Sequence, residues 1–86
     1  MKPRFTVIWS EYAGQELSEI WLRVTDRKSL TEIIDQFDAA LKANPQAIIA
    51  EDREGLRIAT LAGLRITFSI SEDDRIANVL VVREVH

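Results

Sequence analysis

The sequence of 86 residues contains no cysteine and only one histidine, His86. Disulfide bonds, thiolate nucleophiles and zinc fingers are therefore excluded, and histidine-based triads or metal sites almost so. Glycine is also scarce, because the three glycines stand isolated and cannot form a loop that cradles a phosphate chain. We accordingly expect no cofactor and no metal ion.

Long apolar runs are absent as well. Every uninterrupted apolar stretch is far shorter than the roughly 18 residues of a membrane-spanning helix. The N-terminus, residues 1–4, leads into a strand-like pattern and not into the apolar stretch of a signal peptide. We therefore predict a single soluble domain, residues 1–86, in a reducing cytoplasm, with no membrane partner.

The chain also lacks an excess of basic residues, since eleven lysines and arginines against fourteen acidic residues give a net charge of −3. Proteins that bind nucleic acid usually carry a basic surface, because counterion release supplies most of their affinity. Only residues 56–86 depart from this trend, because their charge balances and their cations are all arginines: Arg57, Arg65, Arg75 and Arg83. Any polyanion would bind to this last third of the chain.

Two helical patterns follow a short N-terminal strand at residues 4–9. Ser10 is a suitable N-cap for the first helix, whose apolar residues recur at helical spacing through residues 13–24. Residues 29–32 read as the capping box of a second helix, which the Asn44-Pro45 pair ends. The break between the helices is short, so we expect an antiparallel helical hairpin.

After Pro45 the apolar period changes to two residues, which predicts strands at 56–61, 64–71 and 76–85, preceded by a solvated connector at 46–55. The expected architecture is α+β with the order β-α-α-β-β-β. The helical hairpin should lie on one face of a small antiparallel sheet and leave the other face open.

The arginines are the candidate site residues. Strand alternation points Arg65 away from the core, Arg57 could share that face, and the direction of Arg83 is ambiguous. Two or three guanidinium groups on an open sheet face could bind phosphates bidentately and stabilise charge developing at phosphorus. The alternative is that they pair with carboxylates on the sheet surface or on a partner.

The strand predicted at 76–85 is apolar on both faces along much of its length. Such a strand is either central in its sheet or covered by a partner. We therefore predict that Val79 and Val81, together with the terminal His86, contact a partner protein. A second copy of the chain is one candidate for that partner.

Several short segments match motifs of a known family in order and spacing. They are residues 17–21 (LSEIW), 34–45 (IDQFDAALKANP), 55–57 (GLR), 64–68 (LRITF) and 80–86 (LVVREVH). The first two resemble the paired helices, and the last three the strands, of the RelE/ParE toxin superfamily. These proteins are the toxins of type II toxin–antitoxin modules and include plasmid-stabilisation proteins.

The resemblance implies two alternative activities. RelE-type members cleave mRNA in the ribosomal A site without a metal, using basic side chains to stabilise the transition state. ParE-type members poison DNA gyrase and are not enzymes in their own right. Both are silenced by a cognate antitoxin that wraps around the toxin.

The resemblance also carries residue roles. Arg65 matches the middle-strand arginine that contacts phosphate in the ribonucleases, Arg57 matches the G-L-R arginine, and His86 matches the terminal histidine of many ParE-like members. Residues 56–61 lack the lysine pair of those ribonucleases, and the chain ends before their further arginine and tyrosine. We therefore expect a ParE-like or catalytically weakened toxin. The alternatives are a RelE-type mRNA interferase and a non-toxic module that dimerises through its last strand.

Overall fold

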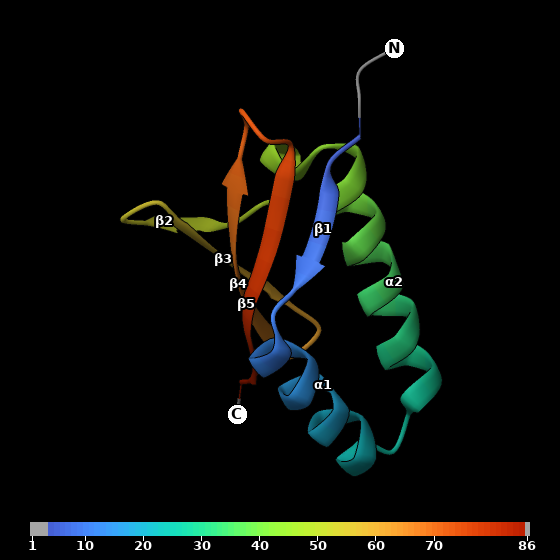
Figure 1. Ribbon diagram of the computed structural model, residues 1–86. Helices are drawn as coiled ribbons and strands as arrows, with labels where there is room; N and C mark the ends of the chain where they lie inside the picture. The colour runs from blue at the N-terminus through green and yellow to red at the C-terminus, as the bar shows by residue number, and fades with distance from the viewer. Residues whose placement is uncertain (1–3, 86) are drawn as a thin grey trace.

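Two helices cover one face of a five-stranded sheet in the computed structural model, which describes residues 4–85 (Figure 1). In chain order the elements are β1 (Thr6–Trp9), α1 (Glu11–Arg23), α2 (Arg27–Ala43), the 3-10 turn η1 (Pro45–Ala47), β2 (Glu51–Arg53), β3 (Leu56–Leu61), β4 (Leu64–Ser71) and β5 (Ile76–Glu84). Neither helix is long and apolar enough to cross a membrane, within the part of the chain that the structure describes. The predicted α+β architecture, with both helices on one face, is confirmed.

The sheet has the strand order β1-β5-β4-β3-β2. Its strands are antiparallel except for β1, which pairs with β5 in parallel. The prediction of a purely antiparallel sheet was therefore wrong. The direction in which two strands pair is set by how the intervening helices return the chain, and the alternation within each strand carries no information about it.

Strand β2 lies within the segment predicted to be a solvated connector. All three of its residues are exposed and charged, so no apolar residue marks it as a strand. Its pairing with β3 depends on the tight turn between them, in which Glu54 and Gly55 have φ values of 54° and 87°. A turn with two residues at positive φ matches the twist of a hairpin, and Asp52 supports it by accepting a hydrogen bond from the Gly55 N–H.

The two helices begin in different ways. Ser10 is the N-cap of α1, as predicted, and its hydroxyl accepts the Ala13 N–H at 2.9 Å. Helix α2 starts at Arg27, earlier than predicted, because Asp26 is the N-cap and accepts both the Ser29 N–H and the Ser29 hydroxyl. These hydrogen bonds lower the pKa of Asp26. The predicted capping box at Ser29 is wrong because a carboxylate three residues earlier performs the same function.

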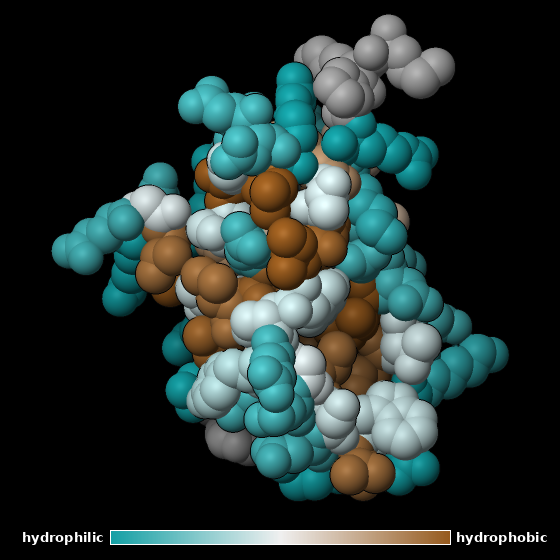
Figure 2. Space-filling view, viewed as in Figure 1, coloured by the Kyte–Doolittle hydropathy of each residue, from teal (hydrophilic) through white to brown (hydrophobic). Residues whose placement is uncertain are grey.

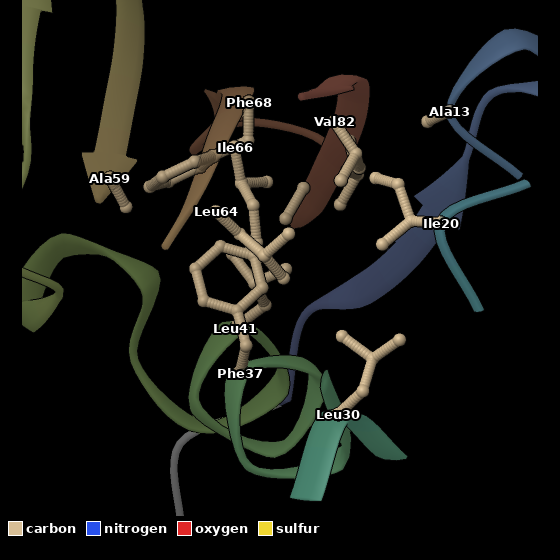
Figure 3. Packing of buried hydrophobic residues seen from close by; sticks show 12 residues of the cluster. Ala13, Ile20, Leu30, Phe37, Leu41, Ala59, Leu64, Ile66, Phe68 and Val82 are labelled. Atoms are coloured by element: carbon tan, nitrogen blue, oxygen red, sulfur yellow. The ribbon is translucent and has the colours of Figure 1, made fainter. Parts of the chain in front are cut away.

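The core fills the space between the helices and one face of the sheet (Figure 3). Phe37 of α2 and Phe68 of β4 meet edge to face there, with ring centroids 5.6 Å apart. The remaining buried members of the cluster are Ala13, Ile20, Leu30, Leu41, Ala59, Leu64, Ile66, Ala77, Val79 and Val82. We call the opposite side of the sheet, which neither helix covers, the uncovered face.

Strand β1, which pairs with β5, is also held against α2. The Phe5 N–H, just before β1, donates to the Lys42 carbonyl of α2 at 2.9 Å, and the Trp9 indole N–H donates to Asp38 at 3.1 Å. Lys42 also pairs with Asp38 at 2.9 Å. Burial raises the pKa of Asp38, but the hydrogen bonds from Lys42 and Trp9 outweigh that effect and leave the pKa below its ordinary value.

Candidate anion-binding site on the uncovered sheet face

Strand β4 divides its side chains cleanly between the two faces. Leu64, Ile66 and Phe68 are buried under the helices, and Arg65 and Thr67 lie on the uncovered face. Arg65 is exposed to solvent there. The sequence-based prediction that Arg65 points away from the core is therefore confirmed.

The direction of Arg83 is decided by a bulge in β5. Thr67 pairs with Val81 but the next residue, Phe68, pairs with Val79, so Leu80 is an extra residue in β5. The bulge shifts the alternation by one position, since an extra residue moves each later side chain to the other face. Arg83 therefore lies on the uncovered face, in an exposed position.

The bulge also aligns Arg83 with Arg65. These two arginines are direct cross-strand partners in the register of β4 and β5. The Cβ atoms of such partners lie about 4.5–5.5 Å apart, and like charges in this arrangement are destabilising. The ion pairs among residues 4–85 involve neither arginine; they are Arg23–Glu84, Lys42–Asp38 and Arg53–Glu51. The two arginines therefore form a compact positively charged patch on the uncovered face.

Tyr12 is the third member of this site, and sequence reasoning missed it. The Arg83 guanidinium donates to the Tyr12 hydroxyl with an Nη2–Oη distance of 3.3 Å, although the two residues are 71 positions apart. Tyr12 belongs to the first turn of α1 and is 47% exposed. The one signal in the sequence was that this aromatic residue falls outside the apolar stripe of its helix.

Arg57 does not join the arginine pair. It is the cross-strand partner of Phe68, and so it lies on the side of the sheet that faces the helices. Its guanidinium donates to the Gln46 side-chain oxygen, and the Gln46 amide donates to Glu72 at 2.6 Å. The suggestion that Arg57 shares a face with Arg65 is therefore wrong.

The error over Arg57 came from its two apolar neighbours. Leu56 and Ile58 suggested that the residue between them points to solvent. In the structure Ala59, two residues after Arg57, is buried beneath the helices, and strand alternation puts Arg57 on the same side. Leu56 is instead 40% exposed.

The predictions for the three partner-contacting residues, Val79, Val81 and His86, have different outcomes. Val79 is fully buried beneath the helices, with 0% of its surface exposed, so a partner cannot reach it and this prediction was wrong. Val81 lies half-buried on the uncovered face. His86 lies outside the described residues. The apolar character of β5 on both faces reflects its central place between β1 and β4.

The helical side of the molecule offers a different surface. Leu17, Ser18, Trp21 and Leu22 of α1 line a hollow of about 340 Å³. Trp21 and Leu22 are 41% and 66% exposed there. Figure 2 shows hydrophobic side chains at the surface of the molecule next to hydrophilic ones. Among residues 4–85, no group of three or more His, Cys, Asp or Glu residues is placed to hold a metal ion.

Comparison with known proteins identifies the fold. The sequence matches no protein-family model and no curated protein. A chain of the RelBE2 toxin–antitoxin complex from Mycobacterium tuberculosis matches the structure with a TM-score of 0.73 and 19% identity, over 94% of this chain and 98% of that one. A chain of the chromosomal ParDE system from P. aeruginosa matches with a TM-score of 0.72 and 15% identity, over 95% and 97%. The chain has the RelE/ParE toxin fold.

A third solved structure, that of a toxin, shows the same fold. The YoeB/ParE toxin from Agrobacterium tumefaciens matches with a TM-score of 0.63 and 20% identity, over 95% of this chain and 100% of that one. The RelE/ParE fold thus accounts for the whole described chain, from β1 to β5. At identities of 20% or less, these matches establish the arrangement of the elements and not the role of any residue.

Proposed function

We propose that this chain is the toxin of a type II toxin–antitoxin module. The observation that carries the proposal is the match over the full length of the YoeB/ParE toxin, 100% of which is covered. A second support is the exposed pair of Arg65 and Arg83, because like charges placed side by side reduce stability and are explained by an anionic target.

The partner in this proposal is a cognate antitoxin. The hollow on α1 supports this part, because Trp21 and Leu22 expose apolar surface that a partner helix or extended segment could bury. Two of the structural relatives come from a toxin–antitoxin complex and a toxin–antitoxin system. Co-purification with the product of the adjacent open reading frame tests this partner directly.

We favour a ParE-like mode of action, in which the chain poisons DNA gyrase by binding to it. General acid–base catalysis is most often performed by histidine or carboxylate side chains. The groups that the described uncovered face presents near Arg65 are arginine, tyrosine, threonine and serine side chains. This chemistry suits binding better than proton transfer.

RNA cleavage at the ribosome is the second candidate. The same arginine pair favours it, because two guanidinium groups on one face could stabilise the charge that develops on a phosphorane. Whichever candidate holds, Arg65 and Arg83 are the residues on which activity should depend.

Expression in a bacterium from a tight inducible promoter tests the proposal. We expect growth arrest with induction of a DNA-damage reporter and with intact mRNA. Arg65→Ala and Arg83→Ala should relieve the arrest, and circular dichroism should show that both variants remain folded. Arg53→Ala is the matched control, because Arg53 is an exposed arginine on the edge strand β2 and pairs with Glu51.

The alternatives give different results in the same experiment. Arrest with cleaved mRNA and a silent damage reporter would establish the ribosome-dependent nuclease instead. Unimpaired growth, with full-length protein present in the cells, would contradict both toxic activities and leave the dimerisation module.

A further inference from the structure

The bulge at Leu80 determines which residue each face of β5 presents. Without it, the pairing of Phe68 with Val79 would continue in step and bring Arg83 opposite Leu64, on the side of the helices. With it, Glu84 takes that place and forms an ion pair with Arg23 of α1. The bulge therefore exchanges an arginine for a glutamate beside α1 and sends the arginine to the uncovered face.

Ser10 contacts the bulge with its side chain, next to a backbone hydrogen bond that continues the pairing of β1 with β5. Its N–H donates to the Val79 carbonyl at 2.9 Å, and its hydroxyl donates to the Leu80 carbonyl at 3.0 Å. The same hydroxyl accepts the Ala13 N–H, so one side chain both caps α1 and bonds to the bulge. A bulge leaves backbone groups outside the regular ladder, and each needs another partner.

The first turn of α1 contacts β5 a second time through Tyr12. This residue accepts a hydrogen bond from the Arg83 guanidinium at 3.3 Å. Figure 1 shows the start of α1 next to the end of β5. The turn therefore holds the backbone of β5 at the bulge and the side chain of Arg83 three residues later.

We propose that Ser10 and Tyr12 are positioning residues for Arg83. Ser10 stabilises the bulged register of β5, and Tyr12 directs the guanidinium that this register exposes next to Arg65. The use of the arginine pair for binding an anion rests on the proposed function. The choice of register does not rest on it, so the two parts can fail separately.

The register without the bulge, in which Arg83 would pair with Leu64, is the alternative that the contacts of Ser10 must disfavour. In that register Arg83 would lie near Arg23. Glu84 would move to the uncovered face and lose its ion pair with Arg23. The registers therefore differ in the charge next to α1. Loss of the Ser10 hydroxyl donor removes the partner that the Leu80 carbonyl has in the bulged register.

Substitutions at position 10 separate the cap from the bulge contact. Ser10→Thr keeps a hydroxyl that both accepts and donates, so it is the matched control. Ser10→Asp keeps a good N-cap acceptor but cannot donate to the Leu80 carbonyl, because a carboxylate has no proton to give. Backbone NOEs between β4 and β5 in isotope-labelled protein report the register directly.

We expect cross-strand NOEs between Arg65 and Arg83 in the unmodified protein and in Ser10→Thr. In Ser10→Asp these NOEs should weaken or vanish, and NOEs between Leu64 and Arg83 should appear. Retention of the full Arg65–Arg83 pattern in folded Ser10→Asp would overturn the role of Ser10. If Ser10→Asp does not fold, Ser10→Ala with the same NOE measurement takes its place, with the same two outcomes.

Titration with inorganic pyrophosphate tests the use of the site. Tyr12→Phe leaves every charge in place, and we expect it to weaken binding about three- to tenfold, the worth of one hydrogen bond. Combined with Arg83→Ala, it should weaken binding no further, because Tyr12 acts only through Arg83. If Tyr12→Phe weakens pyrophosphate binding by the same factor with Arg83 present and with Arg83→Ala, the positioning role of Tyr12 is overturned. Failure of the unmodified protein to bind pyrophosphate, with the register shift still seen in Ser10→Asp, would count against the proposed anionic target and leave the role of Ser10 intact.

Discussion

The two faces of β4 differ in what their residues do. On the covered face Ile66 and Phe68 are fully buried and join the helices to the sheet. On the uncovered face Arg65 and Thr67 contribute little to packing, and Arg65 stands opposite a like charge. Neighbouring residues of one strand therefore serve stability and binding separately, and a substitution should affect one property without the other.

The largest expected effect is on the covered face. Phe68→Ala should lower the free energy of unfolding by about 3–5 kcal/mol, because it removes a fully buried ring and leaves a cavity against Phe37. Urea denaturation followed by circular dichroism measures the loss. Thr67→Ala, one residue away on the other face, should change it by less than about 1 kcal/mol. Similar losses for both would show that the two faces are not separate in the way we describe.

The turn that leads into β4 should show a smaller effect with a clear sign. Gly63 has φ of 80°, and no neighbouring atom lies within 4 Å of the place that a Cβ atom would take, so Gly63→Ala would be strained only in its backbone. We expect a loss of about 1–2 kcal/mol in thermal or chemical denaturation. Gly14→Ala is the matched control, because it lies in α1 with equal space around it and should stabilise the protein by about 1 kcal/mol. An equal loss at both positions would contradict the role of φ at Gly63.

The link between β1 and α2 should make stability depend on pH. The folded protein holds the pKa of Asp38 below its ordinary value, so the unfolded chain binds the proton more readily. The contribution is therefore present above about pH 4 and is lost as the pH falls through the folded pKa. Asp38→Asn should cost about 1 kcal/mol at pH 7 and flatten the acid side of the stability profile. An acid profile identical to that of the unmodified protein would contradict this role of Asp38.

The smallest expected effect on stability is that of Arg65→Glu, which tests the uncovered face of β4 directly. Arg65→Glu replaces a cross-strand repulsion with an attraction to Arg83, and should stabilise the protein by about 0.2–1 kcal/mol. The gain should shrink at high salt, because both side chains are exposed. Growth arrest on expression should be lost in the same variant. A stable variant that remains fully toxic would remove Arg65 from the proposed function.

The covered face and the first helix were predictable from local patterns. The alternation of β4 placed Arg65 outside and Phe68 inside, and Ser10 was recognisable as an N-cap from its position before an apolar helical stripe. The start of α2 was missed because Asp26 and Ser29 are both good capping residues, and only the backbone geometry distinguishes them. Strand β2 was missed because three charged residues leave no apolar pattern.

Of the two arginines in the pair, only the position of Arg65 could be predicted from the sequence. Arg65 follows from alternation in a regular strand, whereas the place of Arg83 depends on a bulge at Leu80 that no local pattern marks. Arg57 was misplaced because its apolar neighbours lie on the uncovered face, near the edge of the sheet. Tyr12 joins the site through a contact that spans almost the whole chain.

The amino-acid sequence by itself determined the two helices, the strands other than β2, their amphipathic faces and the outward direction of Arg65, because these depend on spacings within one helix or strand. Tertiary structure alone decided that β1 pairs in parallel, that Val79 is buried, and that Arg83 lies beside Arg65. The physical reason is that register and strand direction depend on hydrogen bonds between distant residues, such as that from Ser10 to Leu80, which become defined only when the chain has folded.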